Sequence, residues 1–292
     1  MSRLTVALTV LAVLSAPAQV ETVRDMVGRE VPVPAAPRRI VSLVPSVTEI
    51  LYALGVDDLL VGVTTLCDFP PAARDKPKVG GIVNPSLEAI AALRPDLVIA
   101  TTEGNREPTI QQLEAIGIRV YVVSPKSFAG VLESITRIGQ LVGRDERAER
   151  LGRELRRRGA DVALRVEDRP RPNVVYLVWA DPVVVPGRDT LITDLIRMAG
   201  GTSVSADERI DWPRLSLEQV VAKAPEVIIV GTQNRIHVDD ALRRWREQKL
   251  LLPALRAGRV HAIDGNLVHR PGPRIVDGLE ALARAIHPGA LP

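Results

Sequence analysis

Two glutamates, Glu88 and Glu218, occupy matching places in a segment that the chain repeats. Residues 86–102 read SLEAIAALRPDLVIATT and residues 216–232 read SLEQVVAKAPEVIIVGT, at a constant offset of 130 residues (88 to 218). Each copy predicts a short helix that begins after a serine, then a proline-containing turn and a buried strand. The repeat predicts two similarly built lobes that expose similar surfaces.

A carboxylate in the first turn of a helix has two possible roles. It stabilises the helix by about 0.3–1 kcal/mol, because it complements the positive end of the helix dipole. One carboxylate on each lobe could also dock onto matched basic pockets of a two-fold symmetric partner. The sequence pattern is compatible with both roles for Glu88 and Glu218.

Motifs of the common enzyme classes are missing from the sequence. It contains no G-x-G-x-x-G after a predicted strand, no G-x-x-x-x-G-K-[ST], no G-x-S-x-G and no H-E-x-x-H. The histidines have no chelating spacing, so we expect no protein-bound metal and no cofactor; they lie at positions 237, 261, 269 and 287. We therefore expect a binding protein and not an enzyme. An exported enzyme on the same scaffold is the alternative from another class.

Strand and helix patterns alternate on both sides of a helical middle segment. Short apolar runs such as RIVSLV at 39–44 predict buried strands, and helical patterns of about ten residues separate them. This alternation predicts an α/β fold with mainly parallel sheets. Residues 129–142 and 146–166 read as helical throughout. We expect them to form a long helical bridge that joins two similar lobes.

Charge spacing supports an exposed helix in the second half of this bridge. Acidic residues precede arginines at i,i+4 in the pairs Glu146–Arg150, Glu149–Arg153 and Glu154–Arg158. Such pairs stabilise the exposed face of a helix. We interpret this arginine-rich run as a solvated helix face.

The predicted domain organisation has five parts. They are a signal peptide at 1–18, an N-terminal extension of two short strands at 19–38, an N-terminal α/β lobe at 39–126, a helical bridge at 127–170 and a C-terminal α/β lobe at 171–292.

The first residues predict export. Arg3 precedes an apolar run from Leu4 to Leu14, and the small residues of Ala16-Pro17-Ala18 follow. This run is shorter than the roughly 20 apolar residues of a membrane-spanning helix. We expect cleavage before Gln19 and a soluble periplasmic protein, with a buried N-terminal helix as the alternative.

The remaining composition fits such a protein. The formal net charge of +3 is too small to indicate a nucleic-acid partner. Cys67 is the single cysteine, so no intramolecular disulfide can form, and we expect its side chain to be a small buried hydrophobe. We expect a monomer.

The chain resembles the periplasmic binding proteins for iron chelates and cobalamin, and within that family its cobalamin-binding members. The resemblance covers residues 38–287. Its most specific stretches are RIVSLVPSVTEILYALG (39–55), DFPP (68–71), LEAIAALRPDLVIA (87–100), ERIDWPRLSLEQV (208–220) and RPGPRI (270–275). The resemblance implies a two-lobed fold that holds a corrinoid in the cleft between the lobes and delivers it to an ABC importer.

The resemblance also implies roles for particular residues. Glu88 and Glu218 match the glutamates that dock onto the two membrane subunits of the importer. Leu66 and Trp179 match positions in the ligand cleft. The segment DGNLVHR matches a ligand-contacting loop, which here consists of Asp264, Gly265, Asn266, Leu267, Val268, His269 and Arg270.

Departures from the cobalamin-binding pattern leave other chelates open. Tryptophans that flank the corrin are missing near Gly81 and at Thr101. A ferric siderophore or haem is therefore the alternative ligand, and Arg106, Arg270 and Arg274 could face an anionic siderophore. Trp212 is expected to pack beneath the helix of Glu218.

Overall fold

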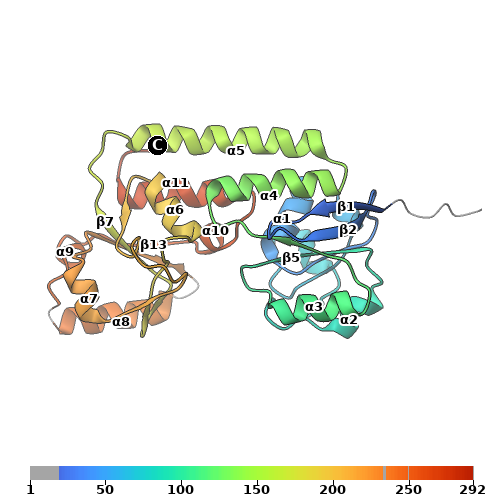
Figure 1. Cartoon of the computed structure of the whole chain (residues 1–292). Coiled ribbons are helices and arrows are strands. Elements are labelled where there is room, and N and C mark those ends of the chain that lie inside the picture. Colours follow the sequence, from blue (N-terminus) through green and yellow to red (C-terminus); the bar gives the residue numbers. More distant parts are fainter. Residues whose placement is uncertain (1–19, 233–234, 249, 292) are drawn as a thin grey trace, which may run out of the picture.

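A computed structural model of the protein describes residues 20–232, 235–248 and 250–291. The predicted signal peptide at 1–18 lies outside these residues. Within the described part of the chain, no helix is long and apolar enough to cross a membrane. Figure 1 shows two α/β lobes side by side, with a long helix running over both of them.

The N-terminal lobe is built on a four-stranded parallel sheet in the order β4-β3-β5-β6. All five residues of β5 are buried, as expected for a strand that is covered on both faces. The strands are β3 (Ile40–Ser42), β4 (Leu60–Val63), β5 (Leu97–Thr101) and β6 (Val120–Val123). The helices are α1 (Pro45–Ala53), α2 (Leu87–Ala92) and α3 (Glu107–Ala115), and 3-10 turns lie at Asp57–Leu59 and Pro71–Asp75.

The C-terminal lobe repeats this plan with a parallel sheet in the order β10-β7-β12-β13. Its strands are β7 (Asn173–Leu177), β10 (Thr202–Ser203), β12 (Val227–Gly231) and β13 (Val260–Ile263). Its helices are α6 (Leu191–Met198), α7 (Leu217–Ala222), α8 (Arg235–Glu247), α9 (Pro253–Arg256), α10 (Asn266–His269) and α11 (Ile275–Ile286).

A small antiparallel sheet in the C-terminal lobe was not predicted. It consists of β8 (Trp179–Ala180), β9 (Val183–Val184) and β11 (Arg214–Leu215). The apolar run at 174–179 predicts a single strand, but the structure ends β7 at Leu177 and places Trp179 in this second sheet. The apolar run continues through the break, so its pattern does not mark where one sheet ends and the other begins.

The internal repeat is preserved in three dimensions. Ser86 and Ser216 cap α2 and α7, each through a side-chain oxygen that accepts a backbone N–H of the first turn. Beyond each helix a non-glycine residue adopts the left-handed conformation, with φ 45° at Arg94 and 44° at Ala224. The lobes therefore share the local geometry of the helix, the turn and the strand.

Two antiparallel helices, α4 (Phe128–Leu141) and α5 (Asp145–Val166), form the bridge. Figure 1 shows that α5 extends from the N-terminal lobe to the C-terminal lobe. Two of the three expected i,i+4 ion pairs are present on α5. In place of the third, Arg158 binds Asp277 and Glu280, with both ion pairs at 2.7 Å. This arginine therefore ties the bridge to α11.

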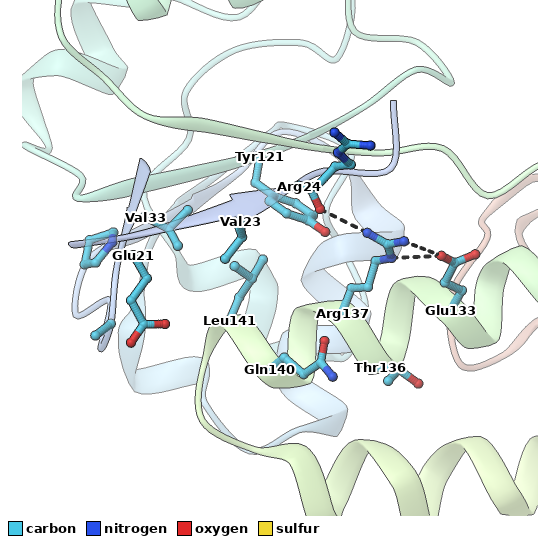
Figure 2. A pocket seen from close by; sticks show the side chains of 12 residues that line it. Glu21, Val23, Arg24, Val33, Tyr121, Glu133, Thr136, Arg137, Gln140 and Leu141 are labelled. Carbon is cyan, nitrogen blue, oxygen red and sulfur yellow. Dashed lines mark hydrogen bonds and ion pairs between the residues drawn. The ribbon is translucent and has the colours of Figure 1, made fainter. Parts of the chain in front are cut away.

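The N-terminal strands β1 (Val20–Arg24) and β2 (Glu30–Pro34) form the expected hairpin, with Gly28 in its turn at φ 88°. Figure 2 shows a pocket between this hairpin and α4, in which Arg137 donates hydrogen bonds to Glu133 and to the carbonyl oxygen of Arg24. The hairpin therefore packs on the N-terminal lobe and on α4.

Candidate functional site

A cavity of about 300 Å³ lies between the two lobes. The N-terminal lobe and the link to α4 contribute Glu103, Gly104 and Pro125, which follow the carboxyl ends of β5 and β6. The C-terminal lobe contributes Thr190, Leu191, Ile192, Trp212, Val268, His269 and Pro271. Ligands of open α/β sheets bind outside the carboxyl ends of the strands. This cavity is therefore the candidate binding site.

Three other cavities are larger, but each lies outside the interface between the lobes. The pocket of Figure 2, of about 400 Å³, is enclosed by the hairpin, β6 and α4. Cavities of about 550 and 470 Å³ share Arg29 and Glu114 in their walls, and these two residues form an ion pair at 2.9 Å. None of these three cavities contains a residue of the C-terminal lobe.

His269 presents an uncharged imidazole to the inter-lobe cavity. Its Nε2 lies 2.8 Å from the hydroxyl oxygen of Tyr176, whose ring is buried in β7. Desolvation lowers the pKa of His269 to about 4, although the residue keeps an exposed surface. Burial also raises the pKa of Tyr176, so the phenol stays protonated. Neither group carries a charge near neutral pH.

Two acid–arginine contacts join the lobes beside this cavity. The carboxylate of Glu49, on α1, accepts hydrogen bonds from Arg274 at 2.6 and 2.9 Å. Asp68, beyond the end of β4, accepts one from Arg270 at 2.6 Å. The Arg274 guanidinium also lies 3.9 Å from the centre of the Phe69 ring. The arginines come from the C-terminal lobe and the acids from the N-terminal lobe.

A third contact joins the lobes near the cavity. Lys126 and Asp211 form an ion pair at 3.0 Å. Glu103 lies close to both charges, and its partial burial raises the pKa of its carboxyl group while Lys126 opposes that rise. Charged groups of both signs therefore surround the cavity.

Comparison with known proteins identifies the family of the chain. The periplasmic binding protein family matches residues 40–267. The chain belongs to this family. A vitamin B12-binding protein of Photorhabdus laumondii is 30% identical over 87% of this chain and 89% of its own length. An ABC transporter substrate-binding lipoprotein of Bacillus subtilis is 31% identical, over 91% and 85% respectively.

Solved structures agree with the family assignment. The periplasmic haem-binding protein RhuT of Roseiflexus sp. RS-1 in its apo form superposes with a TM-score of 0.76. It is 30% identical and covers 87% of this chain and 99% of that chain. This periplasmic binding protein thus has the two-lobed α/β fold of a solute-binding protein.

The segment expected to form a ligand-contacting loop is partly helical in this periplasmic binding protein. Residues Asn266–His269 form α10, and the Asp264 carboxylate accepts a hydrogen bond from the Asn266 N–H at 3.0 Å. Val268 and His269 line the cavity. Gly265 is buried, and the Leu267 backbone lies against Gly278 of α11.

The other residues that were expected in the ligand cleft do not line the cavity. Leu66 and Trp179 are exposed, but neither is among the residues that line the cavity. The Trp179 indole N–H donates to the carbonyl oxygen of Asp181 at 2.8 Å. Arg270 and Arg274 hold the inter-lobe carboxylates, whereas Arg106 is exposed at the start of α3.

The expected role of Trp212 was wrong. Its side chain is 40% exposed and lines the inter-lobe cavity, whereas we expected it to be packed beneath α7. Glu49 was not predicted as a site residue; it is a single carboxylate within the apolar run VTEILYAL. A buried charge usually needs a partner, so that isolated acid was the available signal. Cys67 is buried, as expected.

Glu88 and Glu218 lie away from the cavity in the first turns of α2 and α7. Both side chains are exposed. The N–H groups of its own helix start, and then Ser86, hold the pKa of Glu88 below its usual value. Ser216, and then the backbone, do the same for Glu218. Both carboxylates are ionised at neutral pH, and Figure 1 places both helices on the side away from α5.

Among the described residues, no group of three or more histidine, cysteine, aspartate or glutamate side chains could hold a metal ion.

Proposed function

We propose that this protein captures a corrinoid in the periplasm, holds it between its lobes and delivers it to an ABC importer. The observation that carries the proposal is the matched pair of serine-capped helices, α2 and α7, on the two lobes that enclose the cavity. Each helix exposes one ionised carboxylate, Glu88 or Glu218. A binding protein that meets a two-fold symmetric importer needs such paired contacts.

Docking through these carboxylates is an electrostatic step. Charge-assisted hydrogen bonds between carboxylates and arginines are short and directional. On an exposed surface they mainly set the orientation and the rate of association. The likeness to an ABC transporter substrate-binding lipoprotein supports an importer as the partner. Removal of the signal peptide at 1–18 would release the chain into the periplasm.

The likeness to a vitamin B12-binding protein supports a corrinoid as the ligand. The cavity of about 300 Å³ is at the lower end of the range for small-molecule sites, so it would hold one part of the ring. The rest of a corrinoid requires the lobes to separate at their inter-lobe contacts. Because the helix α5 spans both lobes, we expect this movement to be small.

Haem is the second candidate, and one feature of the cavity favours it. The uncharged imidazole of His269 lines the cavity, and its nitrogen that does not contact the Tyr176 hydroxyl could ligate an iron that arrives in a porphyrin. The likeness to a haem-binding protein supports this candidate as well. A His269→Ala change should abolish a haem-specific absorbance shift if the imidazole binds the iron.

A titration of the chain from Gln19 onward separates these ligands. Cyanocobalamin, dicyanocobinamide, hemin and a panel of ferric siderophores are added, and binding is followed by calorimetry and by tryptophan fluorescence. Saturable one-to-one binding of a corrinoid is the expected result. Silence with both corrinoids, together with binding of hemin or one ferric siderophore, overturns the choice of ligand and leaves the family assignment intact.

A further inference from the structure

Arg270 lies at the edge of the inter-lobe cavity but is already neutralised. It stands between His269 and Pro271, which both line the cavity. Its Nη1 lies 2.6 Å from Asp68 Oδ1 and 3.5 Å from Glu49 Oε1. The Arg270 side chain is 14% exposed, whereas that of Asp68 is 47% exposed. The acid therefore covers the arginine from the solvent side.

The charge of the neighbouring arginine, Arg274, is also paired with a carboxylate. Arg274 uses Nε and Nη2 to bind both oxygens of Glu49, whose side chain is 2% exposed. The two arginines thus face two carboxylates, and the four groups together carry no formal net charge. A ligand that brings its own carboxylate to this place must compete with Asp68 for Arg270.

This competition is unfavourable for an anionic ligand. Asp68 is held by the fold at hydrogen-bonding distance, so its pairing with Arg270 loses less entropy than pairing with a free ligand. The hydrogen bond from Arg270 also lowers the pKa of Asp68, so the acid stays ionised at neutral pH. A second carboxylate would meet its negative charge at short range. Amide and hydroxyl groups meet no such repulsion.

We propose that Asp68 determines selectivity: by occupying Arg270, it excludes chelates with peripheral carboxylates and admits those with an uncharged periphery. The inference rests on the proposed capture of a ring-shaped chelate in this cleft. It goes further by naming the peripheral chemistry of the ligand and the residue that selects it. Loss of Asp68 exposes Arg270 and should convert the cleft into one that attracts carboxylates.

A pair of corrinoids tests this selectivity. Dicyanocobinamide carries amides around the corrin ring, and dicyanocobyrinic acid carries carboxylates at the same places. Wild-type protein should bind the amide form more tightly. Asp68→Asn should bind the carboxylate form about tenfold to one-hundredfold more tightly than wild type does, the range of a charge-assisted hydrogen bond. The amide form serves as the reference ligand, so the ratio of the two affinities, and not either affinity alone, measures the change in selectivity.

Two further variants identify the cause. Asp58→Asn makes the same chemical change at an exposed aspartate of the same lobe, for which no ion pair is seen within the described residues, and it should leave selectivity unchanged. Asp68→Asn combined with Arg270→Gln removes the cation, so the gain in carboxylate binding should disappear. The gain of the single variant should also shrink at high salt.

The outcomes distinguish this inference from the proposed function. If wild type binds both corrinoids equally, or if the double variant keeps the gain, the selectivity role of Asp68 is wrong while corrinoid capture stands. If neither corrinoid binds, hemin and its dimethyl ester replace them as the matched pair. Preference for the ester then overturns only the corrinoid assignment. Preference for hemin overturns the corrinoid assignment and the selectivity role of Asp68.

Discussion

Glu49 and Arg274 join the two lobes by a bidentate contact, with Arg274 Nη2 2.6 Å from Glu49 Oε1 and Nε 2.9 Å from Oε2. The two residues are 225 positions apart in the chain. Glu49 is buried on α1, and Arg274 immediately precedes α11. The parallel fork of an arginine on a carboxylate is the strongest geometry for such a pair. This contact holds α1 of the N-terminal lobe to the start of α11 in the C-terminal lobe.

Removing Arg274 should destabilise the whole protein. Arg274→Ala leaves the carboxylate of Glu49 buried with only the more distant Arg270, so we expect the free energy of unfolding to fall by about 3 kcal/mol. Urea denaturation at pH 7 measures this change. Arg150→Ala is the matched control, because Arg150 pairs with Glu146 on the exposed face of α5 and should alter stability by less than about 0.5 kcal/mol. Equal effects of the two changes would show that the inter-lobe pair contributes no more to the free energy of unfolding than an exposed pair does.

Neutralising Glu88 and Glu218 should impair delivery and leave ligand binding intact. The double variant Glu88→Gln and Glu218→Gln removes both docking charges, which lie outside the cavity. We expect the association rate with importer-containing proteoliposomes to fall by about tenfold or more and its salt dependence to weaken. Surface plasmon resonance follows association, and calorimetry follows ligand binding.

Glu107→Gln is the control for docking. Glu107 is also an exposed acid in the first turn of a helix, but the repeat has no counterpart for it. It should associate like wild type. A loss of association as large as that of the double variant would indicate that general surface charge, and not the paired positions, attracts the importer.

His269 should make stability depend on pH in the acid range. Its folded-state pKa of about 4 lies below its unfolded value of about 6.5, so between these values the unfolded chain binds a proton that the folded chain does not. The folded state therefore loses stability as pH falls from about 6.5 to 4. His269→Asn lacks this titration and should lose less stability between pH 7 and pH 5 in urea denaturation.

A magnetic-resonance titration of the His269 ring checks the same point directly. The ring signal should stay that of neutral imidazole at pH 5.5. A midpoint near 6.5 would mean that the ring is solvated as in an unfolded chain, and the difference between wild type and His269→Asn should then vanish.

Trp212 should report ligand binding more strongly than Trp179. Trp212 lines the cavity, whereas the Trp179 side chain lies in the small sheet with its N–H bonded to Asp181. Trp212→Ala should weaken corrinoid binding by about tenfold, and Trp212→Phe should remove more of the fluorescence quenching than Trp179→Phe does. The opposite order would place the ligand over β8 and β9.

Much of the fold was readable from local patterns. The local patterns predict strands at 97–101 and 120–123 and helices at 217–222 and about 275–286, and β5, β6, α7 and α11 have these bounds. A short buried strand or amphipathic helix is encoded within its own residues. The short strands of the second sheet were not predicted. Two-residue strands carry too little pattern, and their pairing depends on segments that are far apart in the chain.

The candidate site also combines residues that local sequence patterns place and residues that only the packing of the lobes places. The repeated Ser-Leu-Glu motif determined where Glu88 and Glu218 lie, because a serine cap and an acid in the first turn are stabilised within one helix. Only the tertiary structure decided that Trp212 lines the cavity and that Arg270 pairs with Asp68. It also decided that the ion-pair partners of Arg158 lie on α11 and not on its own helix. These contacts join residues that are distant in sequence, and their partners are selected by how the lobes pack and not by any local period.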